Sequence, residues 1–266
     1  AARLERAPAT TRPRAASHYL RLFRPPDEKE LVNSRLERMV FPAVGSVPGV
    51  NGAFWQSDLT MHNPYREPLR LTLRYVTGER GTDRRLTLAP RQTLRWENAV
   101  HTLFQNDDSL GTLWVEHREG RAPVAVVKTS DVAHQASASV EEPLTPRDAA
   151  TASTENAELA IVGIPPRSGL PRRVNVGVVN LGTIPATFRI SVRTRTGAAI
   201  GGNVESGVPE DQVWLVNDVE NALGITLDET MTVRVTVIAG TGVAFATVVE
   251  YGGDSEFIAA IPAQQQ

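Results

Sequence analysis

The sequence predicts an all-β protein made of two tandem antiparallel β-sandwiches that follow an extended N-terminal arm. Three observations support this fold class. Apolar and polar residues alternate over 69–75 and again over 232–237, which is typical of half-buried strands. Segments of this kind recur about every ten residues with Gly or Pro between them, as in sandwich folds. The chain also contains an internal repeat, which divides it into two halves of similar pattern.

The repeat is clearest between residues 59–75 and 176–192, which match at an offset of 117. The matched positions include Asn63 with Asn180, Pro68 with Pro185, and Asn98 with Asn217 in a later segment. We therefore expect one sandwich over 39–132 and a second over 157–266. Within them, single helical turns are expected only over 97–104 and 218–223.

The two sandwiches are separated by residues 133–156, which are rich in Ala, Ser, Thr, Glu and Pro. A segment of this composition has little apolar surface to bury, so it predicts a linker. The alternative is a further irregular strand within 133–140. At the other end of the chain, residues 256–262 are expected to close the second sandwich.

The alternation also identifies the side chains that should fill the two cores. On each alternating strand the large apolar residues occupy every second position, which places them on one face. The residues expected to be buried are Leu59, Met61, Leu71, Leu73, Val176, Val178, Phe188 and Ile190. Trp114 lies between Leu113 and Val115, so we expect its side chain on the opposite face of the sheet.

Residues 1–38 form a basic N-terminal arm with nine basic and five acidic side chains, a net charge of +4. Aromatic and leucine residues lie among the arginines of its first 24 residues, and this combination predicts a segment that orders on a partner. The partner-binding residues we expect are Arg12, Arg14, Tyr19, Leu20, Arg21, Leu22, Phe23 and Arg24. Residues 27–39 are expected to form a short helix. A disordered leader is the alternative for the arm.

The segment 47–59 reads VPGVNGAFWQSDL and is followed by Asn63-Pro64. It resembles the pattern V-P-G-x-x-G-x-x-W-x-[ST]-D-L-x-L-x-N-P of uncharacterised secreted bacterial immunoglobulin-like β-sandwich repeat domains, with Met61 in place of the second Leu. The resemblance covers 41–130 and, more weakly, 159–262, where the Phe-Trp and Asp-Leu pairs are missing. It implies an immunoglobulin-like fold and a location outside the cytoplasm, and it assigns no catalytic residues.

Several kinds of chemistry have no support in the sequence. The chain has no Cys, which excludes disulfides, thiol catalysis and cysteine metal sites. Its histidines do not have the spacing of a familiar metal site. Three of them have one nearby carboxylate each, and such a pair supplies too few ligands for a metal: Asp58 with His62, Glu97 with His101, and Glu119 with His117. We therefore expect no catalytic residues, no metal and no cofactor.

The remaining evidence concerns partners and location. The chain begins at Ala1, which fits a mature protein without its signal peptide, although a shortened chain would begin in the same way. A basic arm can bind an acidic protein surface or an anionic membrane, and the inferred location argues against nucleic acid.

The sequence thus predicts a non-enzymatic structural or interaction protein of the periplasm or cell exterior. We expect it to be an accessory subunit of a larger membrane complex on the periplasmic face, or of a surface assembly. The main alternative is a carbohydrate-binding module, in which Trp55, Trp96, Trp114 or Tyr65 would form an exposed platform for a sugar. A hydrolase on a sandwich scaffold is a third possibility, which would require converged carboxylates or a Ser–His pair in a cleft.

Overall fold

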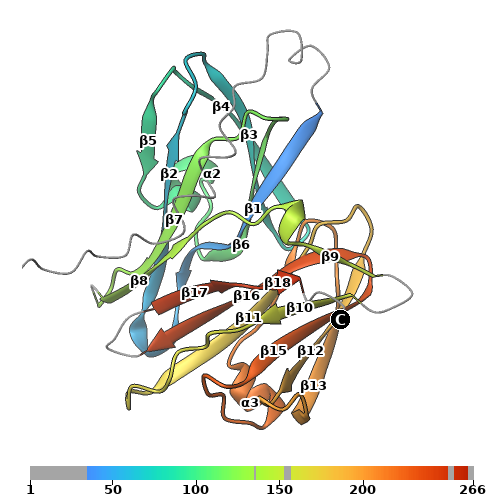
Figure 1. Ribbon diagram of the computed structural model, residues 1–266. Coiled ribbons are helices and arrows are strands. Elements are labelled where there is room, and N and C mark those ends of the chain that lie inside the picture. Colours follow the sequence, from blue (N-terminus) through green and yellow to red (C-terminus); the bar gives the residue numbers. More distant parts are fainter. Residues whose placement is uncertain (1–34, 135, 153–156, 251–254, 263–266) are drawn as a thin grey trace, which may run out of the picture.

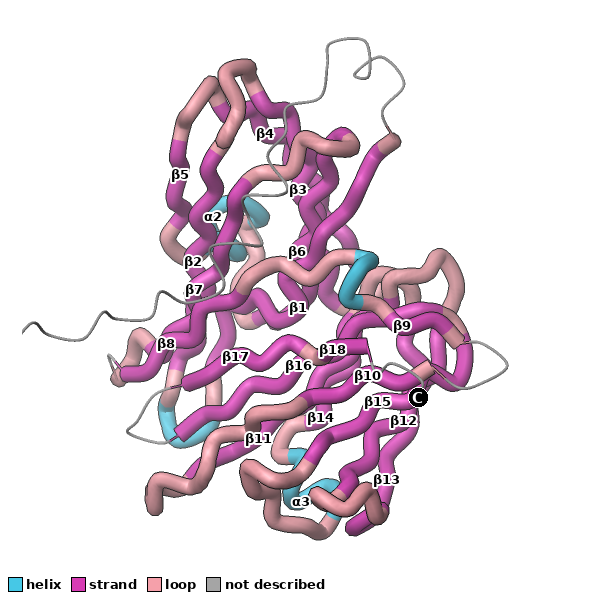
Figure 2. The backbone as a smooth tube through the Cα atoms, viewed as in Figure 1, coloured by secondary structure: helices cyan, strands magenta, loops and turns pink. Residues whose placement is uncertain are grey.

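The computed structural model describes residues 35–134, 136–152, 157–250 and 255–262. Within these ranges the protein is nearly all β, and its strands form three antiparallel sheets (Figure 1). Helices are confined to single short turns, as Figure 2 shows. The prediction of an all-β protein is confirmed.

The first half of the chain, residues 35–141, forms one open sheet that folds over into two layers. The sheet order is β4-β3-β6-β1-β2-β7-β8, with β5 also paired to β2. Its elements are β1 (Leu36–Pro48), η2 (Val50–Gly52), β2 (Phe54–His62), β3 (Leu69–Thr77), β4 (Arg80–Leu88), β5 (Thr93–Trp96), α2 (Ala99–Phe104), β6 (Ser109–Arg118), β7 (Val124–Asp131) and β8 (Ala136–Glu141). The long strand β1 joins the layers, because it pairs with β6 along most of its length and with β2 at its end.

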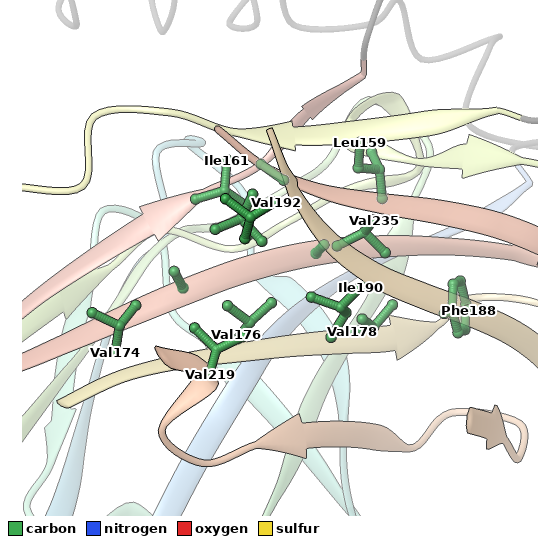
Figure 3. Close-up of a cluster of buried hydrophobic side chains, with 14 of the residues drawn as sticks. Leu159, Ile161, Val174, Val176, Val178, Phe188, Ile190, Val192, Val219 and Val235 are labelled. Atoms are coloured by element: carbon green, nitrogen blue, oxygen red, sulfur yellow. The ribbon is translucent and has the colours of Figure 1, made fainter. Parts of the chain in front are cut away.

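The second half, residues 150–262, contains two separate five-stranded sheets. Their orders are β13-β12-β15-β10-β18 and β14-β11-β16-β17, with β9 paired to β16. After η3 (Pro146–Asp148), the elements are β9 (Ala150–Thr151), β10 (Glu158–Ile161), β11 (Arg172–Asn180), β12 (Ala186–Arg193), β13 (Ala199–Val208), β14 (Val213–Val216), α3 (Val219–Leu223), β15 (Thr232–Ala239), β16 (Thr241–Glu250), β17 (Ser255–Ala259) and β18 (Ile261–Pro262). Side chains from both sheets meet in one apolar core, part of which is drawn in Figure 3.

The internal repeat is reproduced in the hydrogen bonds of two equivalent asparagines. Asn63 directly follows β2, Asn180 is the last residue of the equivalent strand β11, and both are fully buried. The Asn63 amide donates to the carbonyls of Glu67, Leu88 and Ala89, and the Asn180 amide donates to the carbonyls of Ile184 and Val208, at the positions equivalent to Glu67 and Leu88. Each side chain therefore fixes the turn into the next strand in the same way.

The two helical turns are also equivalent, but their alignment differs by one residue from the alignment expected from sequence. α2 is capped by Asn98 and α3 by Asp218, and both caps have left-handed backbone conformations. Each cap receives the same support, since its backbone N–H donates to a side chain of the neighbouring strand, Asp58 or Asn175. The sequence match of Asn98 with Asn217 is therefore wrong by one position, because a carboxylate caps α3.

The predicted core is confirmed. Leu59, Met61, Leu71, Leu73, Val176, Val178, Phe188 and Ile190 are all at least 96% buried. In the first half they lie between the β4-β3-β6-β1 layer and the β5-β2-β7-β8 layer. In the second half they lie between its two sheets.

Two expectations about local structure are wrong. Residues 36–39, expected at the end of a short helix, belong to β1, whose backbone pairs in register with β6 from Leu36 onwards. The rest of that expected helix lies outside the described residues. The predicted linker contains β8, because the exposed edge of β7 supplies backbone partners that an Ala- and Ser-rich segment can use. This is the alternative strand considered for 133–140.

Candidate functional site: the contact between the two halves

An apolar cluster joins the two halves of the chain. The first half contributes side chains from the outer face of its β3-β6-β1 layer, and the second half contributes the outer face of β11 and β16. The cluster consists of Val40, Val76, Trp114, Leu144, Val179, Val243 and Phe245, with Ala43, Ala149, Leu181, Val213, Leu215 and Phe257 packed around it. It is separate from the cores of the two halves.

Strand alternation places the first half's side chains in this contact. Leu113 and Val115 point into the first core, so Trp114 must point away from it, as predicted. Trp114 is nevertheless only 2% exposed, because the second half covers it. Its ring is therefore buried between the halves rather than presented to solvent.

The second half provides a flat surface through a glycine. The ring of Phe245 lies directly over Gly177 on the adjacent strand, where a Cβ atom would come within 2.2 Å of the ring. Phe245 also stacks on Phe257, with 5.5 Å between the ring centroids. Any larger residue at position 177 would push Phe245 out of the contact.

Asp211 is the polar centre of the contact. It lies in the turn between β13 and β14 with a left-handed backbone conformation, φ 61°, and it is 5% exposed. Its carboxylate lies 2.6 Å from a guanidinium nitrogen of Arg38 and 3.8 Å from Nε of Arg74. Both arginines belong to the first half, so the turn of the second half is held by opposite charges.

The backbone of Asp211 is held as firmly as its side chain. Its carbonyl oxygen accepts hydrogen bonds from Thr112 Oγ1 at 2.7 Å and from Trp114 Nε1 at 3.0 Å. The guanidinium of Arg38 lies 4.0 Å from the centre of the Trp114 ring. One residue of the second half is thus bound by four side chains of the first.

The connection between the halves is attached to both of them. Leu144 and Val40 exchange two backbone hydrogen bonds of 2.8 Å, which fixes the connection to β1. Thr145 and Asp148 then form a capping box around η3. Next, β9 pairs with the start of β16 in the second half. The connection therefore restricts the relative movement of the halves.

Glu141, the last residue of β8, is a buried carboxyl group close to this connection. It is 1% exposed, and its Oε2 atom has no hydrogen-bond partner among the described residues. Burial raises the pKa of Glu141 to about 8, because a charged carboxylate loses its hydration there. The group is therefore held in its neutral form over most of the physiological pH range.

The four aromatic residues considered for a sugar platform do not share one surface. Trp114 is buried in the contact, and Tyr65 is 8% exposed with its hydroxyl donating to the carbonyls of Gly120 and Ala122. Trp96 packs against the first core, and the indole of Trp55 lies against Gly49. The geometry thus offers no specific observation in favour of sugar stacking.

Three histidines are bound by groups other than the carboxylates paired with them in the sequence analysis. His62 contacts Thr93, His101 contacts Asp107, and His117 contacts the carbonyl of Arg118. Asp58, expected near His62, instead pairs with Arg95 at 2.9 Å. Within the described residues no three His, Asp or Glu side chains are grouped as metal ligands.

The partner-binding residues expected in the arm lie outside the described residues: Arg12, Arg14, Tyr19, Leu20, Arg21, Leu22, Phe23 and Arg24. In the part of the chain that the structure covers, no helix has the length and apolar character needed to cross a membrane. Comparison with models of known protein families gives no match, and comparison with curated proteins gives none either.

Sequence reasoning missed Asp211 entirely. Its neighbours Pro209, Glu210 and Gln212 indicate an ordinary polar turn, and Asp tolerates a left-handed conformation in any such turn. The only available signal was the repeat, which places Arg91 at the equivalent turn, also with positive φ. A change from Arg to Asp at an equivalent turn indicates a different environment, without identifying the partner.

Proposed function

We propose that this chain is a non-enzymatic structural or interaction protein that acts outside the cytoplasm. In this proposal it is an accessory subunit of a larger membrane complex on the periplasmic face, or of a surface assembly. The observation that supports it best is the buried contact centred on Asp211. A contact with an apolar cluster and charged hydrogen bonds holds two β-structures in one relative orientation, which suits a spacer or adaptor with surfaces at fixed positions.

We further propose that each half is an immunoglobulin-like sandwich in the broad sense. Support comes from strand neighbours typical of that fold in the second half, where the strands are counted from β10 as the first. The second and fifth strands, β11 and β14, are adjacent, and so are the third and sixth, β12 and β15. The first and seventh strands depart from the usual order, since β10 pairs with β15 and β16 pairs with β11. The proposed relation is therefore one of architecture.

The arm is the proposed site of attachment to the assembly. Its basic residues would be attracted to an acidic protein surface or anionic membrane, and its apolar residues would supply desolvated contacts. β1 begins at Leu36, so the arm leaves the first half at the end of β1 that lies beside the β6–β7 turn. The two halves would then project from that attachment point as one body.

The test is isolation of the full chain from its native membranes under mild conditions, followed by identification of co-purifying proteins. We expect defined partners, and we expect their loss when residues 1–24 are deleted while the melting temperature stays nearly unchanged. The matched control removes charge elsewhere, through Arg195→Gln on an exposed loop of the second half. A free monomer without partners in the periplasmic fraction would refute the proposal.

A further inference from the structure

Strand β8 covers one edge of the first-half sheet, next to the connection between the halves. It pairs with β7 only, because the sheet order ends at β8. β17 of the second half lies beside β8, but among the described residues no backbone pairing joins these two strands (Figure 1). The sequence of β8 reads ASASVE, and its one large apolar residue, Val140, is 59% exposed. The strand is therefore held mainly by its backbone hydrogen bonds to β7.

Glu141 of β8 occupies a position that is apolar in the second half. It pairs with Val127 of β7, and the equivalent pair joins Ile258 of β17 to Ala246 of β16. Val127 and Ala246 belong to the cores of their halves, and cross-strand partners share a face, so Glu141 and Ile258 face the two cores. Ile258 packs against its core, whereas Glu141 is 1% exposed and its Oε2 has no partner among the described residues. The fold thus accepts an apolar residue here, and the acid makes the paired strand less stable.

Within the described part of the chain, no charged group stabilises an ionised Glu141. Desolvation is the only cause of its raised pKa, so no neighbouring charge acts on it. Lys128 of β7 pairs with the exposed Val140 and lies on the outer face of the sheet, and Asp131 at the far end of β7 is bound to His134. The remaining charged residues of β1, β17 and the connection that follows β8 are exposed or paired elsewhere, namely Glu37, Arg38, Glu142 and Glu256.

We propose that β8 is a pH-controlled cover over the edge of β7, which stays closed while the Glu141 carboxyl is neutral and opens when that carboxyl ionises. The neutral acid can remain in its buried position, whereas a carboxylate regains its hydration only when the strand leaves the sheet. A strand with few buried apolar contacts is the kind of segment that opens locally while the rest of a protein stays folded. This inference concerns the fold alone, so it stands independently of the proposed function.

The cover is attached at both of its ends. Before β8, the Asp131 carboxylate accepts a backbone hydrogen bond from Ala133 at 3.1 Å. After β8, Leu144 and Val40 exchange two backbone hydrogen bonds of 2.8 Å. Opening of residues 136–141 therefore exposes the backbone edge of β7, while Leu144 keeps the connection on β1 and the two halves stay in contact.

The size of the effect follows from the two ionisation states of Glu141. Its pKa is about 8 with the strand closed, and it returns to the ordinary value of 4.5 when the strand is open and hydrated. Between these two values the population of the open form should rise about tenfold for each pH unit. From pH 5.5 to pH 7.5 the rise is roughly fifty- to hundredfold, and above pH 8 the population should no longer change.

The test is amide hydrogen exchange of the full chain at pH 5.5, 6.5 and 7.5, expressed as protection relative to the intrinsic exchange rate at each pH. Protection of residues 136–141 should fall about fifty- to hundredfold over this range and should stay below that of β3 and β6 at every pH. Glu141→Gln should remove this pH dependence. Glu141→Ile, which introduces the residue of the equivalent position, should also remove it and raise the protection of β8. Glu142→Gln, at the exposed neighbour, should leave the wild-type behaviour intact.

Two outcomes would overturn the proposal. Equal protection of β8, β3 and β6 at every pH would mean that β8 leaves the sheet only when the whole protein unfolds. Lower protection of β8 that does not change with pH, or that changes in the same way in Glu141→Gln and Glu141→Ile, would mean that the strand opens without control by Glu141. Two different replacements are used so that a folding defect in one of them leaves the other as the test.

Discussion

Replacement of Glu141 by Gln should remove a pH dependence from the stability of the protein. Glu141 is buried, and its pKa in the folded state is raised from 4.5 to about 8. Below pH 4.5 the carboxyl is protonated in both states and contributes no pH dependence. Between pH 4.5 and 8 it stays protonated only when folded, so unfolding releases a proton and stability falls as pH rises. Above pH 8 this contribution is constant.

The size of the effect follows from the shift. One pKa unit corresponds to about 1.4 kcal/mol, so the full shift corresponds to a loss on the order of 5 kcal/mol between the two ends of that range. Gln has nearly the same shape and no charge. It leaves its own polar atoms to be satisfied in the same buried site, but that cost does not change with pH.

The assay is urea unfolding of the wild type and Glu141→Gln at intervals from pH 4 to pH 9. The difference between their free energies of unfolding should grow in favour of the variant as pH rises. Glu142→Gln is the matched control, because Glu142 is the exposed neighbour and its replacement should leave the wild-type slope intact. Parallel curves for wild type and Glu141→Gln would show that Glu141 ionises normally in the folded state, and the reasoning from its burial would be refuted.

Three further predictions follow from other buried groups, each measured by urea unfolding. Asp211→Asn should lower the free energy of unfolding by about 1.5–3 kcal/mol, because it removes a charged hydrogen bond while keeping the left-handed turn. Arg91→Asn, at the equivalent exposed turn, should change it little, and equal effects of the two substitutions would contradict the role of Asp211. Asn63→Ala and Asn180→Ala should each lower the free energy of unfolding by about 2–4 kcal/mol, because buried carbonyls lose their hydrogen-bond donors. A loss smaller than that of a substitution at an exposed position would show that these asparagines do not stabilise the two turns. Gly177→Ala should cost about 1–3 kcal/mol through its clash with Phe245, and a neutral result would mean that the ring can move freely.

The parts of the fold that depend on alternation could be predicted from sequence. In β3 apolar residues such as Leu71 and Leu73 alternate with polar ones. This alternation determines which face of the strand is buried, independently of the strands that pair with it. The repeat added the equivalence of Asn63 and Asn180. Each of these side chains donates one local hydrogen bond, to the carbonyl four residues later, and a short sequence pattern can carry that bond.

The contact between the halves could not be predicted in the same way. Alternation shows that Trp114 leaves the first core, but the residue that covers it, Asp211, lies 97 positions away. Nor does composition predict β8, whose pairing is supplied by the free edge of β7 rather than by its own side chains. In both cases the decisive partner is distant in sequence, and a single sequence gives no information on such pairs.

The contact is also asymmetric, which explains why two similar halves carry different surfaces. The first half uses its β3-β6-β1 face and the second its β11-β16 face. A contact between two different faces does not close on itself, so identical halves could be added one after another through the same contact. The unused equivalent faces have changed. Where the first half has Arg38 and Trp114, the second has Glu158 and Arg234, which pair with each other at 3.2 Å. Where the second half has Val179, Val213 and Leu215, the first has His62, Thr93 and Arg95, which are bound within its own sheet. The shared core residues thus define the fold, while the outer positions that differ determine which face of each half enters the contact.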